Sequence, residues 1–506
     1  MDFCLRPPVA KYTHRCAKKG SIGQSNPLKI WERAKHMKRT NLKKAFAVLT
    51  FIALALATSL TYGLMSGQST SAKSAYSPSN ISAAPAASSA AVSAAAQTTT
   101  TGVVMPPVAV FALDTDNTIF VLWPGATAFV RLFRIADSAV AGNVTGIDFR
   151  PAAGNNNVLY AVTDTGNIYT IGLTPATLGR ATLVSTMTTN FPSGYQALMD
   201  FNPVLDAIRF IGSDGANYAV VNSGGTLNAT AVQTSLSYNA NDVNKGASPK
   251  VAGGSYTNNF IGATSTIFYA FDYNLDTFVT IDPATPGGSS ATGGGVLRTI
   301  GNLVTPTGAR VNMSPTVDCD IYTLPNGANR LVGLSGRVFF TVDLAQATAA
   351  TALGTARNVV VQGITMADNG GRFPDIAAPL SSYEAENATQ AGGNKTETIN
   401  AGFIGTGYVN FTDNAPGGST SFQVIQNGTK TLIFRYSNGG AANRPCNVTV
   451  NGASVGTVAF PPTGSFTTYR TVTLPVNLGA ANGFREVRIT STTAAGGPNL
   501  DQFMVQ

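Results

Sequence analysis

The sequence predicts an all-β fold, in which a β-propeller of about five blades precedes a β-sandwich of jelly-roll type. Three observations predict this fold. Only 11% of the 506 residues are charged and 52 are glycines, a composition that suits short strands and tight turns better than helices. Residues 107–368 contain a repeat with a period of about 50 residues, which is typical of propeller blades. Residues 382–506 alternate short apolar strands with turn residues, as a sandwich does.

Charge is distributed unevenly along the chain. Residues 1–44 hold 12 of the 33 Lys and Arg residues and 2 acids, whereas the remainder holds 21 basic and 23 acidic residues. The body has no basic excess, which argues against a nucleic-acid partner. Both histidines, His14 and His36, also lie in residues 1–44, which we call the leader. The body therefore lacks a Ser-His-Asp triad, a His-ligated zinc site and imidazole acid/base catalysis.

The leader reads as a targeting segment. Basic residues follow Met37 and an apolar run begins at Ala45, so residues 37–65 are predicted to be a signal peptide or, alternatively, an uncleaved membrane anchor of about 20 residues. Residues 1–36 are interpreted as a non-native upstream extension. Residues 66–106, rich in Ser, Ala and Thr, are a linker without a core. Both alternatives make the protein secreted or cell-surface, with membrane contact only through the anchor.

The repeat is clearest in two segments. "VTGIDFRP" from Val144 matches "ALMDFNP" from Ala197, and each is followed by two strands joined at a polar turn. Looser copies start at Val251 and Ala309. The turn aspartates are spaced by 50, 50 and 58 residues, and they are Asp114, Asp164, Asp214 and Asp272. Turn chemistry explains these aspartates more simply than catalysis does.

The ends of the repeat region are half-units. Residues 110–122 match the second half of a repeat and residues 359–370 match the first half. We expect them to form a fifth unit, in which the first and last strands share one blade and close the ring. Residues 369–381 are then a linker. Asp148 recurs as Asp200, which favours a structural role for both.

Residues 107–368 resemble an uncharacterised secreted bacterial family, number 4394 among the domains of unknown function. The resemblance implies no activity, and the sequence identifies no catalytic residue in this region. Lone Trp123 is interpreted as a core or rim residue rather than a sugar platform. Cys319 and Cys446 are interpreted as buried apolar residues rather than halves of a disulfide.

Two glutamates open the C-terminal module after 351 residues without any. Glu384 and Glu386 are two apart on an expected strand, so their side chains share a face. Asp501 lies in the last strand, which in a sandwich can run beside the first. Three carboxylates with backbone carbonyls suit Ca²⁺, a hard cation that takes oxygen ligands. The alternative is a solvated edge strand whose charges discourage sheet pairing.

An ordered set of motifs resembles carbohydrate-binding modules of families 6 and 35. The motifs are "YEAENAT", "GYVNF", "FRYSNGG", "VNG", "PPTGSFTTYRTVTLPVNL" and "GGPNLDQFMV". The resemblance implies a structural calcium ion at Glu384, Glu386 and Asp501. It also implies a sugar site at the loop end of the sandwich, formed by Tyr408, Phe466 and Asn499.

The module departs from the family where Phe466 stands, because the family usually has Trp there and residues 382–506 contain none. The alternative is that Phe466 and Tyr408 are core residues. Arg435 is interpreted as a structural hydrogen-bond donor. These features predict a secreted protein whose calcium-stabilised module binds a polysaccharide or glycan. The alternatives are a glycosidase or lyase with the propeller as catalytic domain, and a surface adhesion or structural protein.

Overall fold

The computed structural model describes residues 103–506, except residues 104, 136–139, 153, 156, 190–196, 224–225, 283–293, 349–355, 367–372, 412–414 and 481–482. The predicted upstream extension, the signal peptide and nearly all of the linker before residue 107 lie outside the described residues. Within them, no helix combines the length and apolar character needed to cross a membrane. The elements are strands, apart from α3 (Ala345–Thr348) and the short 3-10 helix η2 (Ala385–Asn387). The all-β prediction is confirmed.

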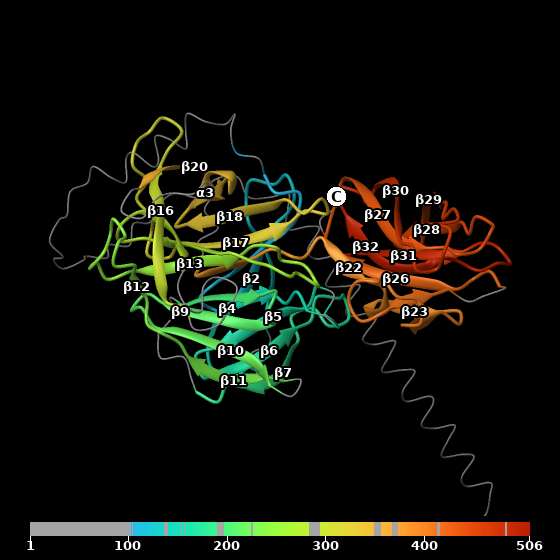
Figure 1. The fold of residues 1–506 in the computed structure, drawn as a ribbon, viewed down its shortest axis with the longest axis horizontal. Helices are drawn as coiled ribbons and strands as arrows, with labels where there is room; N and C mark the ends of the chain where they lie inside the picture. The colour runs from blue at the N-terminus through green and yellow to red at the C-terminus, as the bar shows by residue number, and fades with distance from the viewer. Residues whose placement is uncertain are drawn as a thin grey trace, which may run out of the picture. The chain divides into compact units, whose positions relative to one another are not determined.

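The repeat domain is built from successive groups of four antiparallel strands (Figure 1). The first is β21 (Asp375–Ala377), β1 (Val110–Leu113), β2 (Thr118–Leu122) and β3 (Val130–Arg134). The second is β4 (Val144–Phe149), β5 (Leu159–Thr163), β6 (Asn167–Ile171) and β7 (Ala181–Thr186). The third is β8 (Ala197–Asn202), β9 (Ala207–Gly212), β10 (Asn217–Ser223) and β11 (Thr226–Val232).

Two further groups are joined into one sheet. They are β13 (Val251–Tyr256), β14 (Phe268–Asp272), β15 (Thr277–Ile281) and β16 (Val296–Val304), and then β17 (Asp318–Thr323), β18 (Asn329–Ser335), β19 (Val338–Val342) and β20 (Arg357–Thr365). The outer strands β16 and β20 pair in parallel, and β12 (Ser237–Tyr238) adds to β16. Because this pairing merges two groups, the sheets do not separate into five, and the number of blades stays a prediction.

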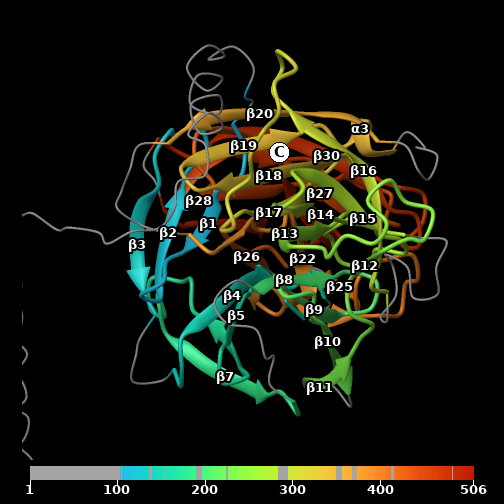
Figure 2. The same cartoon turned by 90° about the vertical axis from the view of Figure 1, so that its left-hand side faces the viewer.

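The innermost strands follow one another around the centre of the domain. β4 lies beside β8, β8 beside β13, β13 beside β17, β17 beside β21, and β21 beside β4. Figure 2 shows β4, β8, β13 and β17 near the middle, with β3, β7 and β11 at the periphery. Apolar side chains from neighbouring groups fill the spaces between them, as where Phe271 of β14 meets Phe340 of β19 at 5.3 Å between ring centroids.

The ring closes through a different segment from the one expected. β21 pairs with β1, with Ala112 opposite Ile376, so the first and last strands do share a sheet. However, β21 lies in residues 369–381, which were expected to be a linker. Residues 359–365 belong instead to β20, which pairs with β19 and β16. The half-unit at residues 359–370 was therefore assigned to the wrong group of strands.

The recurrent turn aspartates have the role predicted from turn chemistry. Asp214 Oδ1 accepts the backbone N–H of Ala216 at 3.0 Å, and Asp272 Oδ1 accepts that of Asn274 at 3.0 Å. Asn326 does the same for Ala328 in the fourth repeat. Such side-chain bonds to the backbone two residues on stabilise the turn itself.

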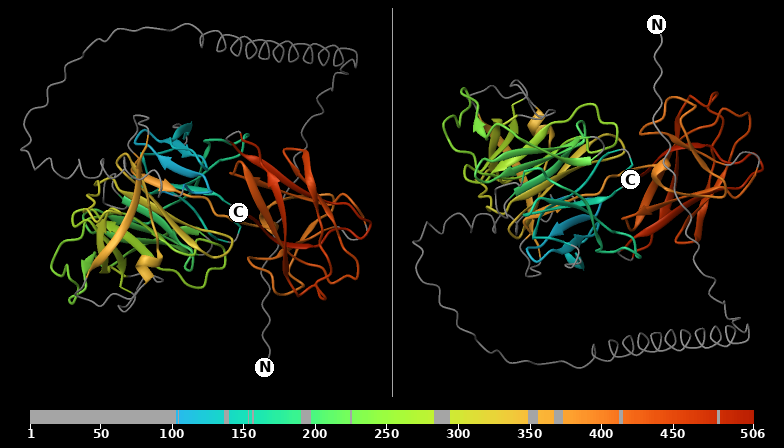
Figure 3. Two further views of the ribbon diagram at one scale, coloured as in Figure 1. Left: turned by 90° about the horizontal axis from the view of Figure 1, so that it is seen from above. Right: turned by 90° about the horizontal axis from the view of Figure 1, so that it is seen from below.

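Two facing sheets form the C-terminal module, drawn in orange and red in Figure 3. The six-stranded sheet contains β24 (Lys395–Glu397), β25 (Tyr408–Asn410), β32 (Asn499–Val505), β27 (Thr429–Ser437) and β30 (Arg470–Asn477) in order, with β22 (Ser382–Glu384) also paired to β32. The five-stranded sheet contains β23 (Thr389–Ala391), β26 (Ser419–Val424), β31 (Arg485–Ser491), β28 (Cys446–Val450) and β29 (Ala453–Val458).

The module's core lies between these sheets. Phe503 of β32 contacts Phe422 of β26 at 4.6 Å and Phe434 of β27 at 5.4 Å between ring centroids. Cys446 is buried in the same core, and Cys319 is buried in the repeat domain. Both thiols are free, so the prediction for them is confirmed.

Candidate functional site

One face of the six-stranded sheet is turned away from the core and carries the predicted site residues. Val409, Leu500 and Tyr436 point into the core. Because side chains alternate along a strand, their neighbours project from the opposite face. These neighbours are Tyr408 and Asn410 on β25, Asn499 and Asp501 on β32, and Arg435 and Ser437 on β27.

Asn499 lies at the start of β32, at the loop end of this face. It is opposite Asn410 on one side and opposite Ser437 on the other. Only 2% of its surface is exposed. Its amide therefore stands in a row of polar side chains near the sheet edge.

Phe466 lies in the loop between β29 and β30 and is half-buried. Its ring covers Gly439, where an added Cβ would lie 2.5 Å from Cδ2 of the ring. The guanidinium of Arg444 lies 5.6 Å from the ring centroid and donates to the Gly497 carbonyl at 3.0 Å. Gly439 follows Ser437 by two residues, and Gly497 precedes Asn499 by two. Phe466 and Asn499 are thus brought to the same end of the sheet.

Tyr408 is placed differently from Phe466, because its side chain is buried. Its hydroxyl accepts a hydrogen bond from Asn400 Nδ2 at 2.8 Å and donates to Glu397 Oε2 at 3.2 Å. Its ring lies 6.1 Å from that of Phe403. The structure therefore holds Tyr408 beneath residues 400–403, on the outer face of the sheet rather than in the core.

Glu384 and Glu386 converge beneath Gly405, but not on one strand as expected, because β22 ends at Glu384 and Glu386 lies in the 3-10 helix η2. An added Cβ on Gly405 would lie 2.6 Å from Glu386 Oε1 and 2.9 Å from Glu384 Oε2. Gln502 Nε2 donates to Glu384 Oε1 at 2.9 Å, and the N–H of Thr406 donates to Glu386 Oε1 at 2.9 Å. Burial raises the pKa of Glu384 to about 8 and also raises the pKa of Glu386. These are enclosed carboxyl groups and not the solvated edge charges of the alternative interpretation.

Asp501 lies on the same face but has its own counter-charge. Its Oδ2 accepts from Arg435 Nη1 in a salt bridge, and its Oδ1 accepts the N–H of Ile404 at 3.0 Å. Arg435 also donates to the Gly402 carbonyl at 2.9 Å, and its guanidinium lies 4.5 Å from the Tyr469 ring centroid. Arg435 has the structural role expected for it. The three predicted calcium ligands do not each place an oxygen within 4.8 Å of the other two. In the described part of the chain, a different group of carboxylates meets this condition.

Sequence reasoning missed Arg444 and Tyr469, which pack against Phe466 and Arg435. No local pattern marks them, since each belongs to a loop and its partner lies more than 20 residues away. In the repeat domain, sequence reasoning also missed the contacts of Arg150. This arginine forms a salt bridge with Asp206 at 2.5 Å and donates to the Tyr160 hydroxyl at 3.1 Å. Trp123 is a core residue, as predicted.

The fold and this face place the chain in the class of all-β proteins that combine a repeat domain with a module similar to carbohydrate-binding modules. Residues 126–365 match the family described as a domain of unknown function (DUF4394), and residues 417–505 match the family described as alpha-galactosidase, CBM13 domain. Both resemblances seen in the sequence are confirmed.

Relatives of known function match about a quarter of the chain over a small part of their own length. An exo-beta-D-glucosaminidase from Amycolatopsis orientalis is 40% identical over 135 residues, which are 26% of this chain and 13% of that protein. Endo-1,4-beta-xylanase B from Cellvibrio japonicus is 42% identical over 108 residues, which are 21% of this chain and 18% of that protein. The chain thus spans less than a fifth of either relative.

Solved structures similar to this chain include family 35 carbohydrate-binding modules. A native module from Clostridium thermocellum is 39% identical, with 24% of this chain and 95% of that chain covered and a TM-score of 0.23. A module from Paenibacillus barcinonensis is 32% identical, with 25% and 97% covered and a TM-score of 0.23.

Proposed function

We propose that this is a secreted carbohydrate-binding protein, in which the C-terminal module attaches the repeat domain to a polysaccharide. Two observations support this most strongly: residues 417–505 match the family described as alpha-galactosidase, CBM13 domain, and segments of 108–135 residues of the chain are 40–42% identical to parts of enzymes named for glucosaminide and xylan substrates. The loop-end face adds a chemical reason. Phe466 offers a partly exposed ring for the C–H face of a sugar, and the partly exposed amide of Asn410, beside the buried Asn499, offers hydrogen bonds for hydroxyl groups.

Retention on polysaccharides tests the binding proposal. The full chain is expected to be retained by at least one member of a panel that includes xylan and chitosan. Phe466→Ala should weaken that binding about 30-fold, the effect of losing a dominant aromatic contact of about 2 kcal/mol.

The matched control is Val232→Ala, which removes an exposed apolar side chain from the repeat domain and should bind normally. Circular dichroism shows whether both variants remain folded. If wild type is retained by no member of the panel, or if folded Phe466→Ala binds as tightly as wild type, the proposed site is wrong.

We infer that the module is stabilised by calcium held by Glu384, Glu386 and Asp501. The two glutamates fit such an ion, since their carboxylates converge and Glu386 Oε2 is buried without a hydrogen-bond partner among the described residues. Asp501 would contribute from β32, on the same face of the sheet as Glu384. The ion would supply the positive charge that allows two buried carboxylates to ionise together.

Calcium should therefore raise the melting temperature of the full chain, and Glu386→Gln should remove one bound calcium per chain. At 100 times the dissociation constant, the expected stabilisation is about 2.7 kcal/mol. Glu397→Gln, a change of the same kind on the same sheet, is the control and should keep the ion. An unchanged calcium content in Glu386→Gln would contradict this assignment.

A further inference from the structure

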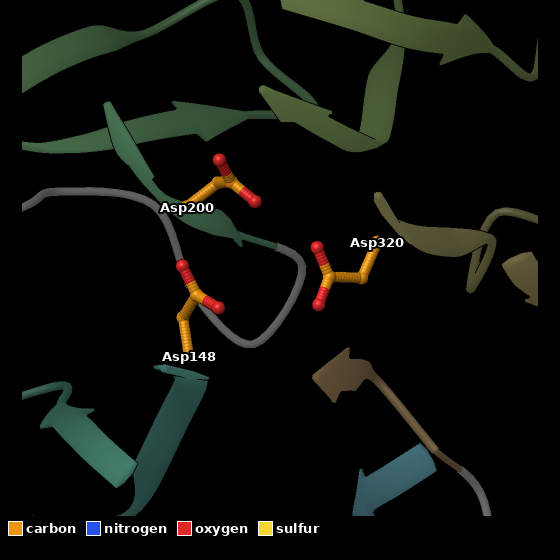
Figure 4. A group of neighbouring side chains, drawn as sticks. All are labelled: Asp148, Asp200 and Asp320. Carbon is orange, nitrogen blue, oxygen red and sulfur yellow. The ribbon is translucent and has the colours of Figure 1, made fainter. Parts of the chain in front are cut away.

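Three aspartates from separate groups of strands meet at the centre of the repeat domain. Asp148 of β4, Asp200 of β8 and Asp320 of β17 each place a carboxylate oxygen within 4.8 Å of the others. Figure 4 shows the three side chains pointing toward one another. All three are at least 96% buried. They lie on the innermost strands, so the closure of the ring brings them together.

Backbone N–H groups from the next innermost strand hold each carboxylate in place. Phe201 donates to Asp148 Oδ2 at 2.8 Å and Tyr256 donates to Asp200 Oδ1 at 3.0 Å. Asp320 Oδ2 accepts the N–H of Ala378 at 2.6 Å. Such bonds favour the ionised form and fix the direction of the remaining lone pairs.

A fourth carboxylate, outside this group, points to a missing ligand. Asp375 of β21 is 99% buried, and its Oδ2 accepts the N–H of Ile147 at 3.1 Å. A Cβ on Gly146 would lie 2.8 Å from that oxygen, and Gly146 and Asp148 project from the same side of β4. The Asp375 carboxylate therefore lies beside Asp148 on the axis-facing side. Among the described residues, its buried Oδ1 has no partner apart from Asp318, another buried aspartate, which hydrogen-bonds with the Asp375 side chain.

Within the described residues, the salt bridges of Lys and Arg do not involve any of the four aspartates. Arg209 is opposite Asp200 in the strand register, and it donates to the Tyr256 hydroxyl at 2.5 Å and to Asn217 Oδ1 at 2.9 Å. The body contains no histidine. Burial, followed by the charge of neighbouring aspartates, raises the pKa of Asp148 and of Asp200 well above the usual range.

We propose that a calcium ion binds at the centre of the repeat domain, held by Asp148, Asp200 and Asp320, with Asp375 Oδ1 as a further ligand. Carboxylate oxygens are the ligands of hard divalent cations. Oxygens on opposite sides of Ca²⁺ are about 4.6–5.2 Å apart, and those around Mg²⁺ about 4.2 Å apart. A spacing of up to 4.8 Å therefore admits Ca²⁺ without rearrangement. The ion links β4, β8, β17 and β21, and so stabilises the ring at the point where the chain closes it.

Calcium content and thermal stability of the full chain test this site separately from that of the module. In the Glu386→Gln background, which lacks the proposed module site, we expect one calcium per chain after desalting and a melting temperature that falls with EDTA and recovers with calcium. Adding Asp200→Asn should lower the calcium affinity at least about tenfold. The asparagine keeps an oxygen to accept the Tyr256 N–H and removes only the charge.

The opposite results would overturn the proposal. If the aspartates hold protons instead of an ion, the Glu386→Gln protein binds no calcium, magnesium or manganese at this centre and EDTA leaves its melting temperature unchanged. Asp200→Asn then relieves repulsion and raises that temperature or leaves it as it is. Asp148→Asn, which likewise keeps its acceptor oxygen, is the second variant if Asp200→Asn does not fold. The metal measurement on the Glu386→Gln protein needs neither of them.

Discussion

Replacing Arg435 by methionine is expected to lower the free energy of unfolding of the C-terminal module by about 3–5 kcal/mol. Asp501 is fully buried, and Arg435 is its counter-charge. Methionine retains much of the apolar stem but leaves the carboxylate in the sheet without a cation. The change also removes the guanidinium from the Tyr469 ring and from the Gly402 carbonyl. Calorimetry of the full chain measures the loss as a lower melting temperature of the module.

Two further variants separate charge from packing. Arg435→Lys keeps the charge and should lower the free energy of unfolding less than Arg435→Met does. Arg435→Met combined with Asp501→Asn should recover most of the lost stability. Saturating calcium should also reduce the loss in Arg435→Met, since the proposed ion would neutralise Asp501. If the Arg435→Met single variant melts at the wild-type temperature, the ion pair does not stabilise the module.

Phe503→Ala is expected to lower the free energy of unfolding of the module by about 3–5 kcal/mol, the range for truncating a buried aromatic side chain to alanine. Phe503 of β32 contacts Phe422 from the opposite sheet, together with Phe434 and Tyr383. Its truncation therefore leaves a cavity between the two sheets. Phe503→Leu fills most of that space and should cost less. Calorimetry reports the module, whereas fluorescence of Trp123 reports the repeat domain, because residues 382–506 contain no Trp.

A Phe503→Ala protein as stable as wild type would show that the two sheets do not depend on this aromatic cluster. A comparable loss in Phe503→Leu would mean that the ring geometry matters more than the filled volume. Either result is read against the unchanged repeat domain, whose Trp123 fluorescence transition serves as the internal reference.

Local sequence patterns predicted the structure correctly where it depends on residues that are close together in the chain. Residues 446–452, "CNVTVNG", alternate apolar and polar side chains, which predicts a strand. The structure has β28 there, with Val448 in the core and Asn447 outside it. Asp214 and Asp272 were correctly assigned to turns. In each case the geometry depends on a few consecutive residues.

Longer-range pairings were not predictable from these patterns. β21 has three residues and no distinctive alternation, and its partner β1 lies more than 250 residues away. The salt bridge of Arg435 with Asp501 spans 66 residues and forms because β27 pairs with β32. Tyr408 looked like a sugar platform, but its burial beneath residues 400–403 depends on how that loop folds back over the sheet.

The sequence by itself determined the all-β class, the repeat, the sandwich and the residue types available for chemistry, because composition and strand periodicity are properties of short segments. It also indicated that Asp148 and Asp200 were equivalent. Only the tertiary structure brought Asp320 and Asp375 to them. Those carboxylates are up to 227 residues apart in the chain, and they become neighbours only because the last short strand returns to the first sheet and closes the ring around a common centre.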